Sequence, residues 1–303
     1  MINYKEEIIR LKEEKNIVIL AHYYMRDEIQ ELADYIGDSY YLSKIGLDVP
    51  HDIIAFCGVH FMAESAKILS PHKKVLLPNM NATCSMVEMA TKKEVLKLKE
   101  KYKDAKIVSY VNSSTEVKSI SDACCTSSNA YDVIQNIDAE EIIFVPDQHL
   151  GSYIQEKVAH KRIILWNGFC CVHHNIRAKD VLHYKEKENQ ELQILVHPEC
   201  RAEVRDLADF VGSTGQMIQY VGQRNEKDFL VVTEEGIFYE LKNKYPDRRF
   251  HSLNILCGPM KCITLQDLYE CLLYEKNEII LEESLREKAE KSLVNMLTLS
   301  EKK

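Results

Sequence analysis

The sequence contains the same pattern three times, and this internal repeat limits the possible folds more than any other feature. The motif LADYIGDS at residues 32–39 aligns with ISDACCTS at residues 120–127 when the chain is shifted by 88 positions. A shift of 175 positions aligns it with LADFVGST at residues 207–214, a close match. A period of about 87 residues is typical of a chain built from copies of one structural unit. We therefore expect three such units in the 303 residues.

Hydrophobic periodicity predicts alternating helices and strands in each copy. The first copy is expected to have helices at residues 4–15, 27–36, 39–47 and 62–69 and strands at 17–20, 53–57 and 74–77. Amphipathic helices at 91–102 and 178–189 open the second and third copies. Such alternation implies parallel sheets covered by helices. The predicted fold class is α/β, with three homologous three-layer α/β/α sandwich units around a pseudo-threefold axis.

The repeat also sets the predicted domain boundaries. They are residues 1–88 for the first α/β unit, 89–175 for the second and 176–262 for the third. Residues 263–303 have no counterpart in a fourth copy, and two helices are expected in them. A terminal segment of this kind often caps a repeat assembly. We expect it to pack on the first unit.

Composition and charge exclude several classes of protein. With 46% hydrophobic and 28% charged residues, the chain can bury a sizeable core. A net charge of -8 argues against a nucleic-acid-binding surface. No apolar run approaches the ~20 residues of a membrane span, and the charged first 15 residues do not resemble a signal peptide. We therefore expect a cytoplasmic protein whose partners are small molecules and whose ten cysteines are reduced.

Polar residues recur in rows at the ends of the predicted strands. Ligands of open parallel sheets bind beyond the carboxyl ends of the strands. A lone histidine there is often structural, and a serine or threonine that caps a helix needs no further function. A pseudo-threefold arrangement would nevertheless collect all the rows in one cavity. The rows are His22, Tyr110 and His197; Tyr24, Asn112 and Glu199; and Ser39, Ser127 and Thr214, the last three expected as helix N-caps.

Three cysteines share the register of the repeat. Cys84, Cys170 and Cys257 each follow an apolar segment, and they are 86 and 87 residues apart. Their periodicity predicts one metal ligand per unit, and thiolates suit either zinc or an iron–sulfur cluster. Structural zinc sites usually use C-x-x-C pairs, which are missing here, whereas a 4Fe-4S cluster on three cysteines leaves one iron open as a Lewis acid. Cys171 and Cys262 are rival ligands, but neither keeps the repeat register.

The predicted helix starts are candidate anion sites. Exposed N–H groups and the positive end of the helix dipole favour anions there. The segment VGSTGQM, with hydroxyls at Ser213 and Thr214, is the strongest of these sites. Glu199 is the one carboxylate in the polar rows, which makes it the first candidate for general acid–base work.

These motifs together resemble the quinolinate synthase family, also known as the quinolinate synthetase A family. The resemblance runs nearly from end to end of the chain. The motifs that carry it are ILAHYY, ADYIGDS, GVHFMAES, ATCSM, YVNSSTE, CTSSNA, FVPDQHLG, GFCCVHH, VHPEC, VGSTGQM and the region around Cys257.

The resemblance implies a reaction and a cofactor. Family members condense iminoaspartate with dihydroxyacetone phosphate to give quinolinate, phosphate and water in NAD biosynthesis. The resemblance implies a 4Fe-4S cluster on Cys84, Cys170 and Cys257, and functional coupling to an aspartate oxidase or dehydrogenase that supplies iminoaspartate. It assigns acid–base steps and substrate contact at the cluster to Tyr24, Tyr110 and Glu199. The residues implied in holding carboxylate or phosphate groups are His22, His197, Ser39, Asn112, Ser127, Ser213 and Thr214.

One departure and two rival functions remain. Many family members have a C-x-x-C-x-x-C segment near the last ligand, whereas this chain has CGPMKC, which argues against redox control through such a pair. The rivals are an aconitase-like iron–sulfur hydro-lyase and a non-enzymatic iron–sulfur sensor. A sensor would not need three polar rows around one cavity.

Overall fold

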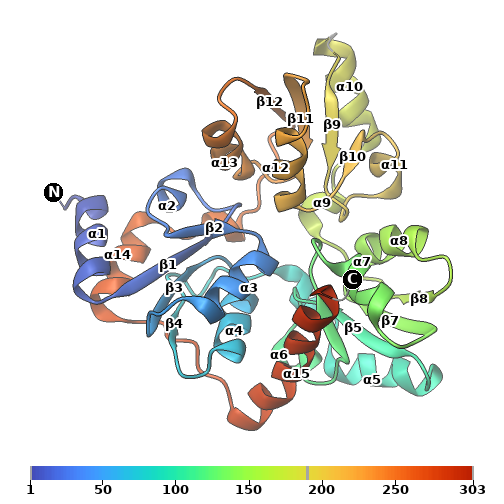
Figure 1. Cartoon of the computed structure of the whole chain (residues 1–303), viewed down its shortest axis with the longest axis horizontal. Helices are drawn as coiled ribbons and strands as arrows, with labels where there is room; N and C mark the ends of the chain where they lie inside the picture. Colours follow the sequence, from blue (N-terminus) through green and yellow to red (C-terminus); the bar gives the residue numbers. More distant parts are fainter. Residues whose placement is uncertain (1, 189–190, 302–303) are drawn as a thin grey trace.

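Three four-stranded parallel sheets of identical topology form the protein. The computed structural model describes residues 2–188 and 191–301 and is shown in Figure 1. The strand orders are β2-β1-β3-β4, β6-β5-β7-β8 and β10-β9-β11-β12. Helices flank each sheet, and the three lobes surround a common centre near α9 (Figure 1). The predicted α/β class with three homologous units is confirmed.

The helices and strands follow one another in the same order in each unit. The first unit contains α1 (Tyr4–Glu14), β1 (Ile17–His22), α2 (Asp27–Gln30), β2 (Tyr35–Gly37), α3 (Ser39–Asp48), β3 (Ile53–Cys57), α4 (His60–Leu69), β4 (Lys74–Leu76) and the 3-10 helix η1 (Ser85–Met89). The second contains α5 (Lys92–Lys101), β5 (Lys106–Tyr110), α6 (Thr115–Lys118), β6 (Ala123–Cys125), α7 (Ala130–Asn136), β7 (Glu141–Val145), α8 (Gln148–Lys157), β8 (Arg162–Leu165) and α9 (Cys171–His174). The third contains α10 (Ala178–Glu188), β9 (Gln193–Val196), α11 (Ala202–Arg205), β10 (Phe210–Val211), α12 (Thr214–Gly222), β11 (Asp228–Val232), α13 (Ile237–Lys244), β12 (Arg249–Ser252) and the 3-10 helix η2 (Pro259–Lys261).

The aspartate of the repeated motif has a structural role. Asp34, Asp122 and Asp209 each accept a hydrogen bond through Oδ2 from the backbone N–H of an isoleucine in the neighbouring strand, at 2.8 Å in every unit. The backbone N–H of each aspartate donates in turn to the carbonyl of the same isoleucine. Two bonds to one residue fix the register of the short edge strand. This shared task explains why the motif is so well preserved between copies.

Two local predictions were wrong. The expected helix at residues 27–36 is a single turn, α2, followed by the edge strand β2, because Asp34 ties this segment to β1. The N-cap of α3 is Asp38, whose carboxylate accepts the N–H of Tyr41, so Ser39 is the first helical residue. Likewise Ser213 rather than Thr214 caps α12, and Ser127 lies ahead of the α7 cap Asn129.

The last part of the chain crosses between units. Helix α14 (Leu265–Tyr274) packs on α1, and the following segment donates the Ile279 N–H to Val75 O in β4. Helix α15 (Glu283–Glu301) packs on α4 of the first unit and on α6, β6 and α7 of the second (Figure 1). The boundaries at 88, 175 and 262 stay a prediction.

The described helices do not include a membrane span. None of them combines the length and the apolar character that crossing a bilayer requires.

Candidate active site

One cavity at the centre of the molecule is lined by side chains from all three units. Twelve of the thirteen site residues predicted from the sequence line it. The remaining one, Ser213, is fully buried and its hydroxyl lies 2.8 Å from the hydroxyl of Ser128, which does line the cavity. The predicted residues that line it are His22, Tyr24, Ser39, Cys84, Tyr110, Asn112, Ser127, Cys170, His197, Glu199, Thr214 and Cys257.

The three repeat cysteines have equivalent surroundings. Cys84 and Cys170 are the N-cap residues of the helical turns η1 and α9, and Cys257 immediately precedes Gly258, the N-cap of η2. In each loop a backbone N–H two or three residues further on, from Met86, His173 or Met260, acts to lower the pKa of the thiol. Backbone N–H donors of this kind favour the thiolate form that binds metals.

Burial nevertheless keeps these thiols protonated when no cation is near. It raises the pKa of Cys84 to about 12 and that of Cys257 to about 11, and it raises the pKa of Cys170 well above its ordinary value. The charge of Glu199 adds to the effect at all three. Three such thiols around one cavity therefore need a strongly bound cation before they ionise together.

The other cysteines divide into three groups. Cys171 is exposed at the cavity and accepts the hydroxyl of Ser85 at 3.4 Å. Cys262 instead donates to Pro259 O at 3.0 Å, and it is not among the residues that line the cavity. Cys57, Cys124, Cys125, Cys200 and Cys271 are completely buried, as is common for free cysteines.

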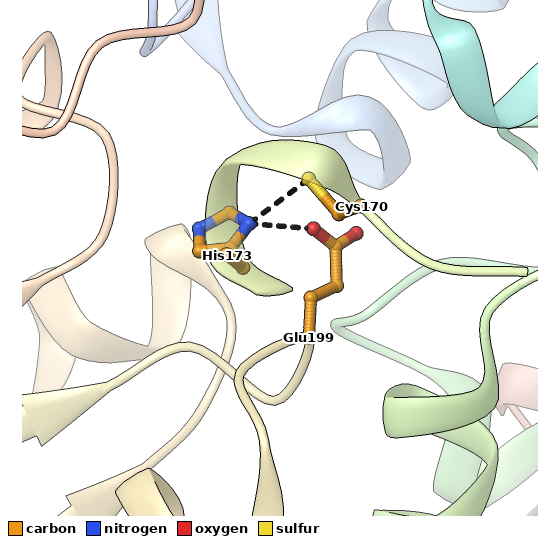
Figure 2. A group of neighbouring side chains, drawn as sticks. All are labelled: Cys170, His173 and Glu199. Atoms are coloured by element: carbon orange, nitrogen blue, oxygen red, sulfur yellow. Dashed lines mark hydrogen bonds and ion pairs between the residues drawn. The ribbon is translucent and has the colours of Figure 1, made fainter. Parts of the chain in front are cut away.

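A histidine links the predicted carboxylate to a cysteine. His173 Nδ1 lies 2.8 Å from Glu199 Oε2 and 3.3 Å from Cys170 Sγ, as Figure 2 shows. The Tyr110 hydroxyl donates to the other carboxylate oxygen, Glu199 Oε1, at 2.6 Å. The ring of His173 also stacks on that of His197, with centroids 4.5 Å apart. Both oxygens of Glu199 are thus engaged by groups that can exchange protons.

The network continues from His173 into the first unit. Its Nε2 lies 2.8 Å from the hydroxyl of Thr233, which lies 2.6 Å from the hydroxyl of Tyr24. The hydroxyl of Thr214 donates to Tyr24 at 2.9 Å. Hydroxyl, imidazole and carboxylate therefore follow one another in the order Thr233, His173, Glu199. This is the order in which an oriented imidazole can take up a hydroxyl proton.

The protonation states follow from burial and contacts. Burial raises the pKa of Tyr24 and of Tyr110 well above the ordinary value, so both hydroxyls keep their protons at neutral pH. Burial alone would raise the pKa of Glu199, but the hydrogen bonds from His173 and Tyr110 oppose it, and the pKa lies below its ordinary value. Glu199 is therefore ionised at neutral pH.

Two equivalent histidines are neutral. Burial lowers the pKa of both His22 and His197 to about 3. Their Nδ1 atoms accept the backbone N–H groups of Tyr24 and Glu199, at 3.1 and 3.4 Å. The proton of each neutral ring therefore lies on Nε2, where it is available to a ligand.

Comparison with known proteins identifies the family. The family described as Quinolinate synthetase A protein matches residues 6–298. The chain is 53% identical over 294 residues to the quinolinate synthase of Clostridium perfringens strain 13, covering 96% of this chain and 97% of the relative. The chain belongs to the quinolinate synthetase A family.

Two further relatives of the same name support this. The quinolinate synthase of Caldicellulosiruptor saccharolyticus is 51% identical over 298 residues, with 98% of both chains covered. That of Clostridioides difficile strain 630 is 49% identical over 297 residues, with 97% of both covered. The resemblance inferred from the motifs is confirmed, as is the prediction that the protein is an enzyme.

Two sets of side chains in this member of the quinolinate synthetase A family could hold a metal, and both include Cys170. The ligand atoms of Cys170, His173 and Glu199 lie within 4.8 Å of one another. However, the His173–Glu199 contact and the Tyr110 hydroxyl already satisfy that carboxylate. The three repeat cysteines come one from each unit and line the same cavity, and of the three Cys170 also contacts His173 Nδ1 at 3.3 Å. The residues therefore fit a metal group held by three thiolates.

The repeat analysis missed several functional candidates. His173, Glu234 and Asp38 line the cavity, and Thr233 joins the hydrogen-bond network behind its wall. No polar row marks His173, because Val87 and Met260 take its place in the other units. The available signal was the GFCCVHH motif, which places His173 three residues after Cys170 and so one helical turn away.

Replacing Gly168 with alanine is expected to displace the loop that carries Cys170. A Cβ at this position would overlap the backbone oxygen of Pro146, so the backbone must move. The Gln148 N–H bond to Gly168 O, 2.9 Å long, would be disturbed as well. We expect the variant to lose about 1–3 kcal/mol of unfolding free energy and part of its bound metal, measured by denaturant unfolding and metal analysis.

Gly258→Ala is the matched control, because Gly258 directly follows Cys257 but a Cβ there would meet nothing within 4 Å. If both variants bound metal like the unmodified protein, the close packing at Gly168 would not be what shapes the Cys170 loop.

Proposed function

We propose that this protein is a quinolinate synthase of NAD biosynthesis. Iminoaspartate condenses with dihydroxyacetone phosphate, and quinolinate, one phosphate and two waters leave, which balances every atom. Family membership and the names of the relatives support the reaction. The observation that carries it is the single cavity, in which three thiols, two tyrosines, a glutamate and two neutral histidines from all three units face one another.

The proposed cofactor is a 4Fe-4S cluster on Cys84, Cys170 and Cys257. One thiol per unit, each with a backbone N–H two or three residues further on that favours its thiolate, suits a group with three equivalent ligand positions. When bound, such a cluster supplies an open iron that acts as a Lewis acid toward a carboxylate, carbonyl or hydroxyl. Cys171 lines the same cavity and is the alternative ligand, although it lies outside the repeat register.

Glu199 is proposed as the general base at the start of the condensation. It is ionised, and it is fixed by Tyr110 at 2.6 Å and by His173 at 2.8 Å. A carboxylate held in this way can take a proton from substrate carbon or nitrogen and return it to a leaving hydroxyl. The Tyr110 hydroxyl, whose pKa is raised, acts as a proton donor beside it.

Tyr24 is proposed as a second proton donor, supplied through Thr233 and His173. A proton lost from the Tyr24 hydroxyl is replaced along the 2.6 Å contact to Thr233 and the 2.8 Å contact to His173. Two dehydrations need two leaving hydroxyls to be protonated. A relay that joins both tyrosines to one carboxylate meets this need.

The proposed substrate-binding residues are the other polar residues of the cavity. The Nε2–H groups of His22 and His197 can donate to carboxylate oxygens. Asn112 Oδ1 is buried without a hydrogen-bond partner among the described residues, which leaves this oxygen free to accept an N–H or O–H of a ligand. The remaining binding residues are Ser39, Ser127, Ser213 and Thr214, and Ser213 and Thr214 stand at the start of α12, where the helix dipole favours phosphate.

The proposed setting is the cytoplasm. Iminoaspartate hydrolyses readily, so an aspartate oxidase or dehydrogenase is the proposed source of it. No contact with that enzyme is needed if both act at the same place and time.

An oxygen-free assay tests the reaction. Purified protein with iron and sulfide restored is mixed with dihydroxyacetone phosphate, aspartate and an aspartate oxidase or dehydrogenase. We expect quinolinate and phosphate in equal amounts, measured by chromatography and phosphate analysis. Dehydration of a hydroxy acid without phosphate release would favour the aconitase-like hydro-lyase, and a cluster without turnover of either kind would favour the sensor.

A further inference from the structure

The residue two positions after the third strand is different in each unit. In two of the three units it is a carboxylate that contacts a cysteine loop. This position is Val59 after β3, Asp147 after β7 and Glu234 after β11. Asp147 and Glu234 are completely buried, although carboxylates are rarely found in such places without a specific partner. Their partners are the loops that carry two of the three repeat cysteines.

Asp147 joins the Cys170 loop to the start of α8. Its Oδ1 accepts the backbone N–H of Leu150 at 2.7 Å, which caps the helix. Its Oδ2 accepts the backbone N–H of Cys170 at 2.9 Å. Because Asp147 is not among the residues that line the cavity, it does not contact a substrate there. Helix capping needs only one of the two oxygens, and the other fixes the backbone of the cysteine.

Glu234 makes the same contact in the third unit. Its Oε1 lies 3.3 Å from the backbone N–H of Cys257, and its Oε2 accepts the N–H of Gly236 at 2.7 Å. Lys261 balances the charge, with Nζ 2.9 Å from Glu234 Oε1, and donates to Tyr24 O at 2.7 Å. One carboxylate therefore ties the Cys257 loop to the backbone of the proposed proton donor Tyr24.

We propose that Asp147 and Glu234 are positioning residues that hold two of the three metal-binding cysteines through their backbone amides. The first unit has no equivalent carboxylate, since the side chain of Val59 cannot accept a hydrogen bond from the backbone N–H of Cys84. The inference rests on the three-cysteine metal site of the proposed function. Residues that orient metal ligands from behind typically contribute about 10–100-fold to metal affinity.

Asp147→Asn separates this role from helix capping. Asparagine is as good an N-cap as aspartate, so its carbonyl oxygen keeps the bond to Leu150. Its NH2 group then faces the N–H of Cys170, and two donors oppose each other. We expect iron release to a chelator to become about 10–100-fold faster. Glu234→Gln makes the equivalent change behind Cys257 and provides a second variant if the first folds poorly.

Asp122→Asn is the matched control. Asp122 is in the same unit, and its Oδ2 also accepts one backbone N–H, that of Ile107 at 2.8 Å. It lies at the amino end of the strands, away from the cavity. We expect it to lose stability like Asp147→Asn but to release iron at the unmodified rate.

A second readout needs no metal. In the metal-free protein, amide hydrogen exchange at Cys170 should accelerate in Asp147→Asn and stay unchanged in Asp122→Asn. The inference is overturned if Asp147→Asn matches Asp122→Asn in both iron release and Cys170 exchange while the unmodified protein binds iron and sulfide. An unmodified protein that binds neither would overturn the proposed metal site itself, and the inference with it.

Discussion

Cys170→Ser is expected to abolish both cluster binding and quinolinate formation. A serine hydroxyl is a much poorer ligand for iron than a thiolate, and the remaining two cysteines cannot hold a group that needs three. Cys84→Ser and Cys257→Ser should have the same effect, because each of the three loops brings its cysteine to the same cavity. Iron and sulfide analysis, visible absorption and the oxygen-free assay measure the loss.

The controls for this prediction are two other cysteines. Cys124 is buried between the hydroxyls of Ser109 and Ser292, at 3.4 and 3.2 Å, so a serine there finds partners and should keep cluster and activity. Cys171→Ser tests the rival ligand beside Cys170 and should also keep the cluster. Equal loss in the repeat cysteines and in Cys124 would contradict the role of the repeat.

Glu199→Gln is expected to keep the cluster and lose catalysis. Glutamine has a similar size, but it cannot accept a proton from the substrate at neutral pH. In addition, its NH2 group cannot accept a hydrogen bond from His173 or Tyr110. Loss of a general base typically lowers the rate by about 10²–10⁴-fold. We therefore expect kcat for quinolinate formation to fall by that range while iron and sulfide content stays unchanged.

Glu156→Gln is the control for the same chemical change. Glu156 pairs with Arg205 at 2.7 Å, and its side chain is 58% exposed. This variant should keep its turnover. Turnover retained by Glu199→Gln as well would remove Glu199 from the mechanism.

The repeat in the sequence predicted most of the architecture and the contents of the cavity. Residues that share a task in every unit, such as Asp34 and its two equivalents, align well and so reveal the period. Cys84, Cys170 and Cys257 could be selected because a strand end is at the same place in each unit. Wherever the three units are alike, the place of a residue in the repeat was therefore enough to predict its place in the fold.

Features that break the threefold pattern could not be predicted in this way. His173 and Thr233 have no equivalent residue in the other two units. Their link to Glu199 depends on loops that approach one another only in the folded chain. Short edge strands such as β2 were missed because three residues carry too little periodicity to be told from a helix end. Asp147 was missed because its partner, the backbone N–H of Cys170, leaves no mark in the sequence.

Metal and sulfide analysis of the protein purified without oxygen tests the central claim most directly. The claim is that three units each supply one cysteine to a single 4Fe-4S cluster in the catalytic cavity. We expect iron and acid-labile sulfide in equal amounts, about four of each per chain. Stoichiometric zinc with no sulfide would contradict the claim.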